Sequence, residues 1–218
     1  MTGAAPETVA QQRFVRASTA AASGRLRWRP GRLAFDEGVV ELDGAKAQVS
    51  AQRRFATQGD PGRVGLDVRA DRLDLDLFPP LDAFAPTDGP DINVSVAAKN
   101  VVSATLGLSI GALDLEARQQ NGALTLQRFS LTQKGLSFSA DGVVKNGVGR
   151  FTSELAADDL KPLAAAMQRA YPGKAADALA ARASELSPAK LSGSLQPSRD
   201  GKRWLLRVDG AAGGTALV

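Results

Sequence analysis

The chain has 218 residues, of which 44% are hydrophobic and 5% aromatic, with a formal net charge of +4 and neither cysteine nor histidine. The missing cysteines exclude disulfides and thiolate metal sites, and the missing histidines exclude a Ser-His-Asp triad and the commonest zinc ligand. Cations and acids are interleaved along the chain, which argues against a nucleic-acid-binding surface. Any catalysis would therefore rest on carboxylates, lysine or tyrosine.

The N-terminal segment, residues 1–22, predicts a short and weakly amphipathic helical arm. It lacks a charged start followed by an apolar stretch, so it is not a signal peptide. No apolar run in the sequence approaches the roughly 20 residues that span a bilayer. The last letters, "GGTALV", are typical of a strand that is just beginning, and we therefore expect a fragment of a longer protein.

From residue 23 onward, apolar residues alternate with polar ones, a period typical of half-buried antiparallel strands. In "RADRLDLDLF" at 69–78, leucines alternate with Asp74 and Asp76. A proline-rich connection follows at 79–91, and the alternation then resumes between "NG", "KG" and "DG" turn signals. The sequence predicts a mainly β (α+β) fold, an extended and curved antiparallel sheet built from repeated meander units.

Two stretches of the chain align as an internal repeat. "GRLAFDEGVVELDGAKAQVSA" from Gly31 matches "GALTLQRFSLTQKGLSFSADG" from Gly122 without a gap. A second match aligns Ala70 with Ala157, so that "ADRL" corresponds to "ADDL". Two copies of a β unit indicate a sheet that is extended by repetition rather than a closed globular enzyme.

After residue 157 the pattern becomes helical. Asp158 is the predicted N-cap of a first helix, and Pro162 falls in its first turn, where proline is tolerated. "YPG" at 171–173 ends this helix, and a second helix runs to about residue 186 before strands resume. The chain thus divides into an arm (1–22), a first β unit (23–90), a second β unit (91–157), a helical hairpin (158–187) and the start of a further β segment (188–218).

Three motifs have both a chemical and a structural explanation. Asp74 and Asp76 would lie about 7 Å apart on one strand face, as an acid–base pair or calcium ligands require, or they are its solvent face. "GAAGGT" at 210–215 could be a phosphate loop, but it lacks the following helix and lysine, and a hairpin or bend fits better. "RLRWRP" could contact nucleic acid or lipid headgroups, or place Leu26 and Trp28 in the core and its arginines in water. The structural explanation is favoured each time, so we expect no catalytic residue, metal or cofactor.

The apolar side of the predicted sheet must be covered by something. The two predicted helices would cover part of it, and the rest would be either an ordinary core or an open trough that holds acyl chains. The period alone selects the candidate groove lining: Leu73, Leu75, Leu77, Leu106, Leu108, Leu113, Leu115, Leu124, Leu126, Leu136 and Phe138.

The meander, the "RADRLDLDLF" strand and the segment "ATLGLSIGALDLEARQQNGALTLQRFSLTQKGLSFSADGVV" resemble the AsmA-like proteins of Gram-negative bacteria, from about Gly24 to the end of the sequence. The resemblance implies a large protein anchored in the inner membrane, whose bulk lies in the periplasm and resembles the bridge-like lipid transfer proteins. In those proteins, repeated β units form a long hydrophobic groove along which lipids move. The helical hairpin departs from the pure β pattern of that family.

The resemblance implies that this chain is a non-enzymatic piece of such a bridge, without its membrane anchor. It would shield phospholipid acyl chains during transport between the inner and outer membranes or during outer-membrane assembly, with envelope proteins as further partners. The residues leave two alternatives open. One is a structural or protein-binding β scaffold that holds no lipid, and the other, ranked last, is a hydrolase that uses Asp74 and Asp76.

Overall fold

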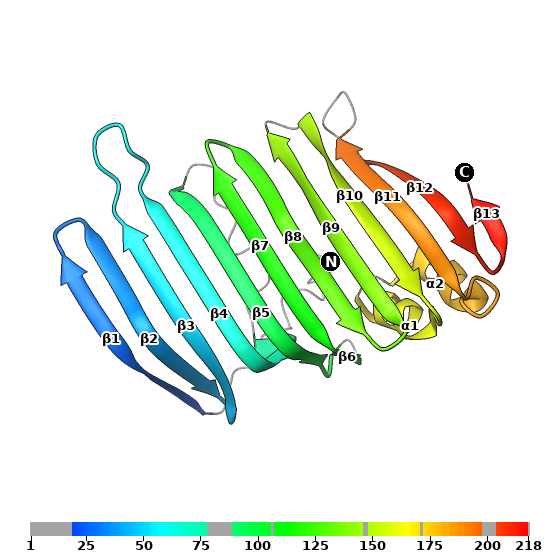
Figure 1. The fold of residues 1–218 in the computed structure, drawn as a ribbon, viewed down its shortest axis with the longest axis horizontal. Coiled ribbons are helices and arrows are strands. Elements are labelled where there is room, and N and C mark those ends of the chain that lie inside the picture. Colours follow the sequence, from blue (N-terminus) through cyan, green and yellow to red (C-terminus); the bar gives the residue numbers. More distant parts are fainter. Residues whose placement is uncertain are drawn as a thin grey trace, which may run out of the picture.

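The structure is a computed structural model that describes residues 19–77, 89–105, 107–145, 148–170, 172–197 and 204–217. Within these ranges one 13-stranded sheet forms a single layer, and two helices lie at one end of it (Figure 1). The mainly β fold with a helical insertion is confirmed. Its elements are β1 (Ala20–Arg29), β2 (Arg32–Leu42), β3 (Ala45–Arg54), β4 (Arg63–Asp74), the 3-10 turn η2 (Leu75–Leu77), β5 (Asp91–Ser103), β6 (Leu108–Ile110), β7 (Ala112–Gln120), β8 (Ala123–Gln133), β9 (Leu136–Lys145), β10 (Val148–Ala157), α1 (Lys161–Ala170), α2 (Lys174–Arg182), β11 (Ala189–Pro197), β12 (Trp204–Ala212) and β13 (Thr215–Leu217).

The sheet order follows the chain order from β1 to β13, except that the short β6 pairs with β5 and leaves β5 beside β7. The described pairs are antiparallel apart from β4 and β5, which run parallel from Arg63 opposite Asp91 to Asp74 opposite Val102. Parallel neighbours need a crossover connection, whereas antiparallel ones need only a hairpin. The expectation of an entirely antiparallel meander is therefore wrong at this one junction. The proline-rich connection predicted at 79–91 lies mostly outside the described residues.

The internal repeat is also a structural repeat. Adding 91 to the residue numbers of β2 and β3 gives the bounds of β8 and β9. The cross-strand partners correspond as well, because Phe35 faces Ala51 in the first copy and Leu126 faces Gly142 in the second. The same shift relates the register of β1 on β2 to that of β7 on β8. Strands β1–β3 and β7–β9 are therefore two copies of one three-stranded unit.

The fourth strand of each copy follows with a different shift. Ala70 faces Ala47 on β3, and Leu155 faces Phe138 on β9, so that β4 and β10 correspond at a shift of 85 residues. The shift falls because the connection between β3 and β4 is longer than the one between β9 and β10. The sequence match of Ala70 with Ala157 is therefore wrong by two residues.

Each copy has a β-bulge at the same place. The pairing shifts between Phe35 and Gly38 on β2, and between Leu126 and Phe129 on β8. A bulge adds one residue to a strand, so two apolar residues three positions apart stay on the same face. The bulge thus explains why the period of two breaks once in each copy.

Two clusters of buried apolar residues stabilise the sheet. The first lies where β4, β5 and β7 meet η2 and β6, around Val101. The second lies where α1 and α2 pack on the ends of the last strands, and it includes Leu160 and Ala164. Asp159 Oδ1 accepts a hydrogen bond from the backbone N of Lys161 at 2.9 Å, so Asp159 rather than the predicted Asp158 caps α1.

The predicted N-terminal arm falls largely on residues 1–18, which lie outside the described residues. Its last part, from Ala20 onward, belongs to β1 and is extended rather than helical. At the other end, β12 and β13 are joined through Gly213 and Gly214, both with positive φ. The "GAAGGT" stretch is therefore a hairpin, as predicted.

Candidate functional site: the apolar face of the sheet

Apolar side chains form cross-strand rows on one face of the sheet. Directly paired residues project from the same face, so the register defines each row. Neighbouring strands lie about 4.8 Å apart, so a row with ten steps is about 48 Å long. The longest such row crosses the sheet from β1 to β12 through Leu26, Phe35, Ala51, Leu66, Val94, Ala117, Leu126, Gly142, Phe151, Leu195 and Leu206.

A second row runs beside the first, two residues away along each strand, on the side where η2 follows β4 and β6 precedes β7. It contains Val49, Val68, Val96, Leu115, Phe129 and Ala140. The ring of Phe129 also meets the ring of Phe138, from the row beyond, edge to face with the centroids 5.8 Å apart. The apolar face is therefore continuous in both directions, along the strands and across them.

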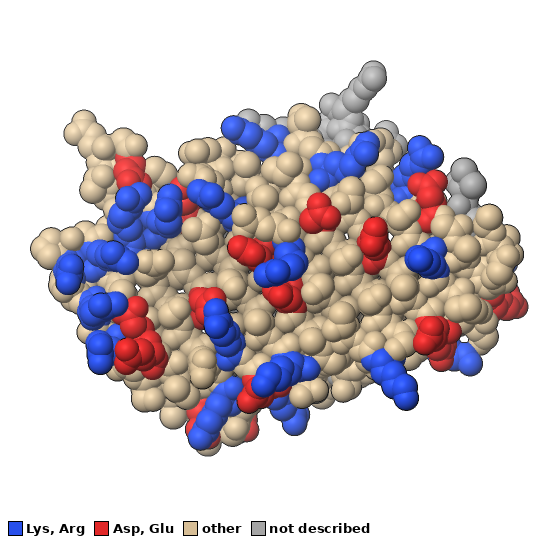
Figure 2. All heavy atoms as spheres, viewed as in Figure 1, with Lys and Arg blue, Asp and Glu red and all other residues tan. Residues whose placement is uncertain are grey.

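The opposite face is mainly polar, and the exposed apolar residues that project from it are Val39, Val143, Val148 and Leu205. Asp67, Ser95, Glu116 and Arg128 form one of its cross-strand rows. Arg128 lies 3.2 Å from a carboxylate oxygen of Asp114 and 3.6 Å from one of Glu116. Figure 2 shows Lys, Arg, Asp and Glu scattered over this face, with cations gathered over the first strands. The alternation of the sequence therefore separates two chemically distinct faces.

Seven of the predicted lining residues lie on β strands and have described side chains, and the register or the packing places them on the apolar face. Leu73 and Leu113 are 5% and 9% exposed and belong to the first buried cluster, so they are ordinary core. Leu136 packs against the helical cluster. Leu115, Leu126 and Phe138 are half-buried, and Leu124 is 47% exposed.

Of the other four predicted residues, one lies elsewhere and three cannot be placed within the described residues. Leu75 lies in η2 rather than on a strand, because β4 ends at Asp74, and it packs against the first buried cluster. The side chains of Leu77 and Leu108 and the whole of Leu106 lie outside the described residues.

Sequence reasoning missed several exposed members of the apolar face. Leu26 and Trp28 on β1 and Leu206 on β12 are each 68% exposed. The expectation that Leu26 and Trp28 lie in the core is therefore wrong, because no described layer covers this end of the sheet. Phe129 was missed because the bulge between Leu126 and Phe129 moves it out of the simple alternation.

Asp74 and Asp76 do not share a strand face. Asp74 is the last residue of β4, and its Oδ1 accepts a hydrogen bond from the backbone N of Asp76 at 3.0 Å. Asp76 accepts a hydrogen bond from Ser103 Oγ at 2.6 Å and another from the backbone N of Thr105 at 3.0 Å. The carboxylate of Asp76 thus fastens η2 to the end of β5, rather than facing solvent as predicted.

Burial acts to raise the pKa of Asp76, but the hydrogen bonds from Ser103, Thr105 and the backbone of Ala104 outweigh it, and the pKa is lowered from its usual value of 3.8. A general acid at neutral pH needs a raised pKa instead. The geometry therefore supports a structural role for the pair.

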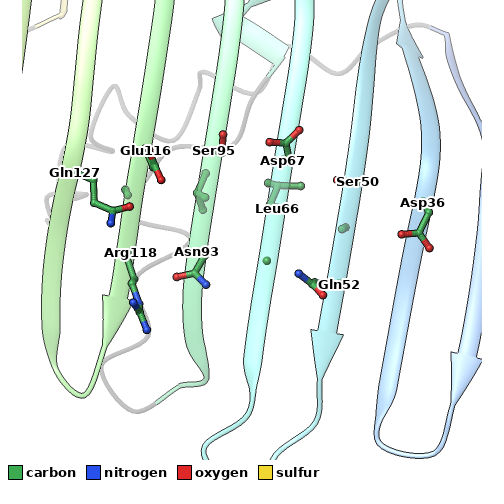
Figure 3. A pocket seen from close by; sticks show the side chains of 14 residues that line it. Asp36, Ser50, Gln52, Leu66, Asp67, Asn93, Ser95, Glu116, Arg118 and Gln127 are labelled. Atoms are coloured by element: carbon green, nitrogen blue, oxygen red, sulfur yellow. The ribbon is translucent and has the colours of Figure 1, made fainter.

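A hollow of about 430 Å³ lies on the polar face, above strands β2 to β8 (Figure 3). Figure 3 shows Gln52 and Asn93 on either side of the β4 strand, where Gly65 has no side chain. Asp67 and Ser95 lie in the next row. None of the predicted lining residues contributes to this hollow, but four members of the apolar row also border it: Ala51, Leu66, Val94 and Ala117.

Comparisons with protein-family models, with curated protein sequences and with solved structures found no match. Within the described ranges, no three Asp or Glu side chains come close enough together to hold a metal ion. Neither described α-helix has the length and apolarity that a membrane span requires.

Proposed function

We propose that this chain is a periplasmic β-groove module of the AsmA-like type that shields phospholipid acyl chains. It would act during lipid transport between the inner and outer membranes or during outer-membrane assembly. The observation that carries the proposal is the apolar row from β1 to β12, which continues in register through every strand pairing. An acyl chain needs contact with CH groups and no hydrogen-bonding partner, and such a row offers that chemistry.

The exposure of this face supports the proposal. Leu26, Leu124 and Leu206 keep 68%, 47% and 68% of their surface exposed, at three places along the width of the sheet. Apolar surface left in water costs about 25 cal/mol per Å², and a contiguous exposed apolar patch usually marks a binding surface. A lipid lying across the rows would remove part of that cost.

The chain offers a matched pair of positions for a test. Leu124 on β8 and Val143 on β9 are both 47% exposed, but Leu124 belongs to the apolar face and Val143, opposite Thr125, to the polar face. A photocrosslinking amino acid placed at each position in cells should give phospholipid adducts at 124 and none at 143. Adducts at neither position, while an established lipid carrier gives them under the same conditions, would count against the proposal.

A second candidate function is a β scaffold that binds envelope proteins and carries no lipid. Two observations favour it. The described hollow of about 430 Å³ lies on the polar face, and α1 and α2 already cover one end of the apolar face. Native mass spectrometry after gentle purification separates the two functions, because a scaffold should carry no phospholipid and a groove module should retain some.

A further inference from the structure

Strand β1 is a long open edge of the sheet. All ten of its residues are exposed, and no described strand pairs with its outer side. An edge strand presents a row of unpaired backbone N–H and C=O groups, which another strand can pair with. This edge is therefore a potential site of strand addition.

The internal repeat provides a template for what such a strand would look like. β7 is the equivalent of β1, and in the second copy its outer side is occupied by β5, which runs antiparallel to it. Val94 of β5 faces Ala117, the equivalent of Leu26, and Asn93 faces Arg118, the equivalent of Arg27. A strand in the same register on β1 would thus continue both faces of the sheet.

The charge of the edge restricts the kind of partner. Arg25, Arg27 and Arg29 project from the polar side of β1, whereas Glu116 stands at the equivalent of Arg25 on β7. Residues 20–54 contain seven cations and four acids, and Figure 2 shows the cations gathered over this end of the sheet. The surplus of positive charge favours acidic residues in a pairing strand.

Two of these arginines already have exposed partners on β2. Arg25 lies 3.6 Å from Glu37, and Arg27 lies 2.6 Å from Asp36. Exposed ion pairs of this kind contribute little to stability, so a further carboxylate could share the guanidinium groups. A second copy of the chain fits less well, because antiparallel pairing of β1 with β1 in a register centred on Arg27 would place arginines opposite arginines.

We propose that the outer edge of β1 is a strand-addition site for another protein. The partner contributes an antiparallel strand in the register that β5 adopts on β7. Its acidic side chains lie beside Arg25 and Arg27, and its apolar side chains lie beside Leu26 and Trp28. The backbone hydrogen bonds supply affinity, and the alternating side chains supply selectivity.

A peptide taken from β5 is the probe. It has the sequence of residues 91–100 with two changes, Asn93→Asp and Ser95→Glu, which place carboxylates opposite Arg27 and Arg25 in the proposed register. The control peptide carries lysine at both positions. The 218-residue chain with Trp204→Phe retains Trp28 as its sole tryptophan, so the fluorescence of Trp28 reports occupation of the edge.

The acidic peptide should shift the Trp28 emission saturably and bind about tenfold more tightly than the lysine peptide, since two opposite-charge pairs differ from two like-charge pairs by roughly 1–2 kcal/mol. N-methylation of the peptide backbone on one of its two edges should abolish binding, and on the other edge should leave it intact. The Arg25→Glu/Arg27→Glu variant, checked for its β circular dichroism, should reverse the peptide preference.

Three results would overturn the proposal. One is the absence of saturable binding by the acidic peptide, and another is equal affinity for the acidic and lysine peptides. The third is a concentration-dependent dimer in sedimentation that competes with the acidic peptide, because a second copy of this chain would then occupy the edge. The peptide series decides the question even if the double variant fails to fold.

Discussion

The two copies of the repeat, β1–β3 and β7–β9, share one backbone register but fill it with different side chains. At the bulge, the first copy has Phe35 and Gly38, and the second has Leu126 and Phe129. A side chain at Gly38 would collide with the ring of Phe35, which therefore occupies the space that Phe129 fills in the second copy. The comparison teaches that the sheet fixes the volume of each row, while the position that supplies the volume can change.

The copies also differ in polarity on the other face. Arg25 lies 3.6 Å from Glu37 in the first copy, and in the second Glu116 lies 3.6 Å from Arg128 at the equivalent positions. The ion pair is thus retained with its charges exchanged between the strands. The two copies thus share the position of the ion pair but differ in which strand carries the cation.

The largest expected effect comes from giving the first copy the phenylalanine that the second copy has at its bulge, Phe129. Gly38→Phe should lower the free energy of unfolding by about 3 kcal/mol, because the new ring meets that of Phe35 in a filled row. Phe35→Leu/Gly38→Phe should recover the part of the loss that comes from the ring of Phe35, while the 2.5 Å approach of a Cβ at position 38 to the backbone O of Val49 remains. Urea denaturation of both variants measures this, and a double variant as unstable as the single one would contradict the volume exchange.

A glycine that is present in one copy and absent from the other gives the next largest effect. Gly142 has φ of 151° and a Cβ there would lie 2.6 Å from the Cα of Phe151, whereas the equivalent residue of the first copy is Ala51. Gly142→Ala should cost about 2 kcal/mol through strain, and Ala51→Gly about 1 kcal/mol through chain entropy. Thermal unfolding of the two variants compares them, and equal losses would show that the conformation at Gly142 does not matter.

The first copy is followed by η2 after β4, and the second by α1 after β10. The stability that Asp76 contributes at the first of these ends should depend on pH. Asp76→Asn should cost about 1.5 kcal/mol at pH 7, because the charge-assisted hydrogen bonds from Ser103 and Thr105 are lost. Since the folded pKa is below 3.8, the wild-type carboxylate stabilises the fold above that pH, and this contribution disappears as the pH falls through the folded pKa.

The matched control is Asp159→Asn at the end of the second copy, where Asp159 caps α1. Asparagine is also a good N-cap, so the loss should stay below about 0.5 kcal/mol. Measured from pH 7 to pH 3, the difference in unfolding free energy between wild type and Asp76→Asn should stay constant well above pH 3.8 and shrink as the pH falls below 3.8 toward the folded pKa. A constant difference across that range would rule out the carboxylate charge as the cause.

The smallest effect concerns the exchanged ion pair. Glu116→Arg and Arg128→Glu should each cost up to about 1 kcal/mol, because each places like charges side by side on paired strands. The double variant, which copies the polarity of Arg25 and Glu37, should recover only part of these losses, because the new carboxylate at position 128 would face Asp114, which lies 3.2 Å from Arg128 in the wild type. A double-mutant cycle at low and high salt measures the coupling, and additive losses would mean that the pair contributes nothing.

The sequence was sufficient to predict the strands and their two faces, because a pleated strand alternates its side chains with a period of two. That period is the same in parallel and antiparallel pairs, so the parallel β4–β5 junction could not be predicted from it. It also says which face a side chain joins and not what covers that face, which is why Leu26 and Trp28 were wrongly expected in the core. Asp76 was misjudged because the end of β4 at Asp74 leaves no mark in the alternation.

The exchanged ion pair has a consequence for the folding of the chain. A repeat whose copies share register carries the risk that β1 pairs with β8, or β7 with β2. The first error would set Arg25 beside Arg128, and the second would set Glu116 beside Glu37. Each wrong hairpin therefore meets repulsion where the right one meets attraction, and this penalises exchange of strands between the copies. The charges therefore favour pairing of each strand within its own copy of the repeat.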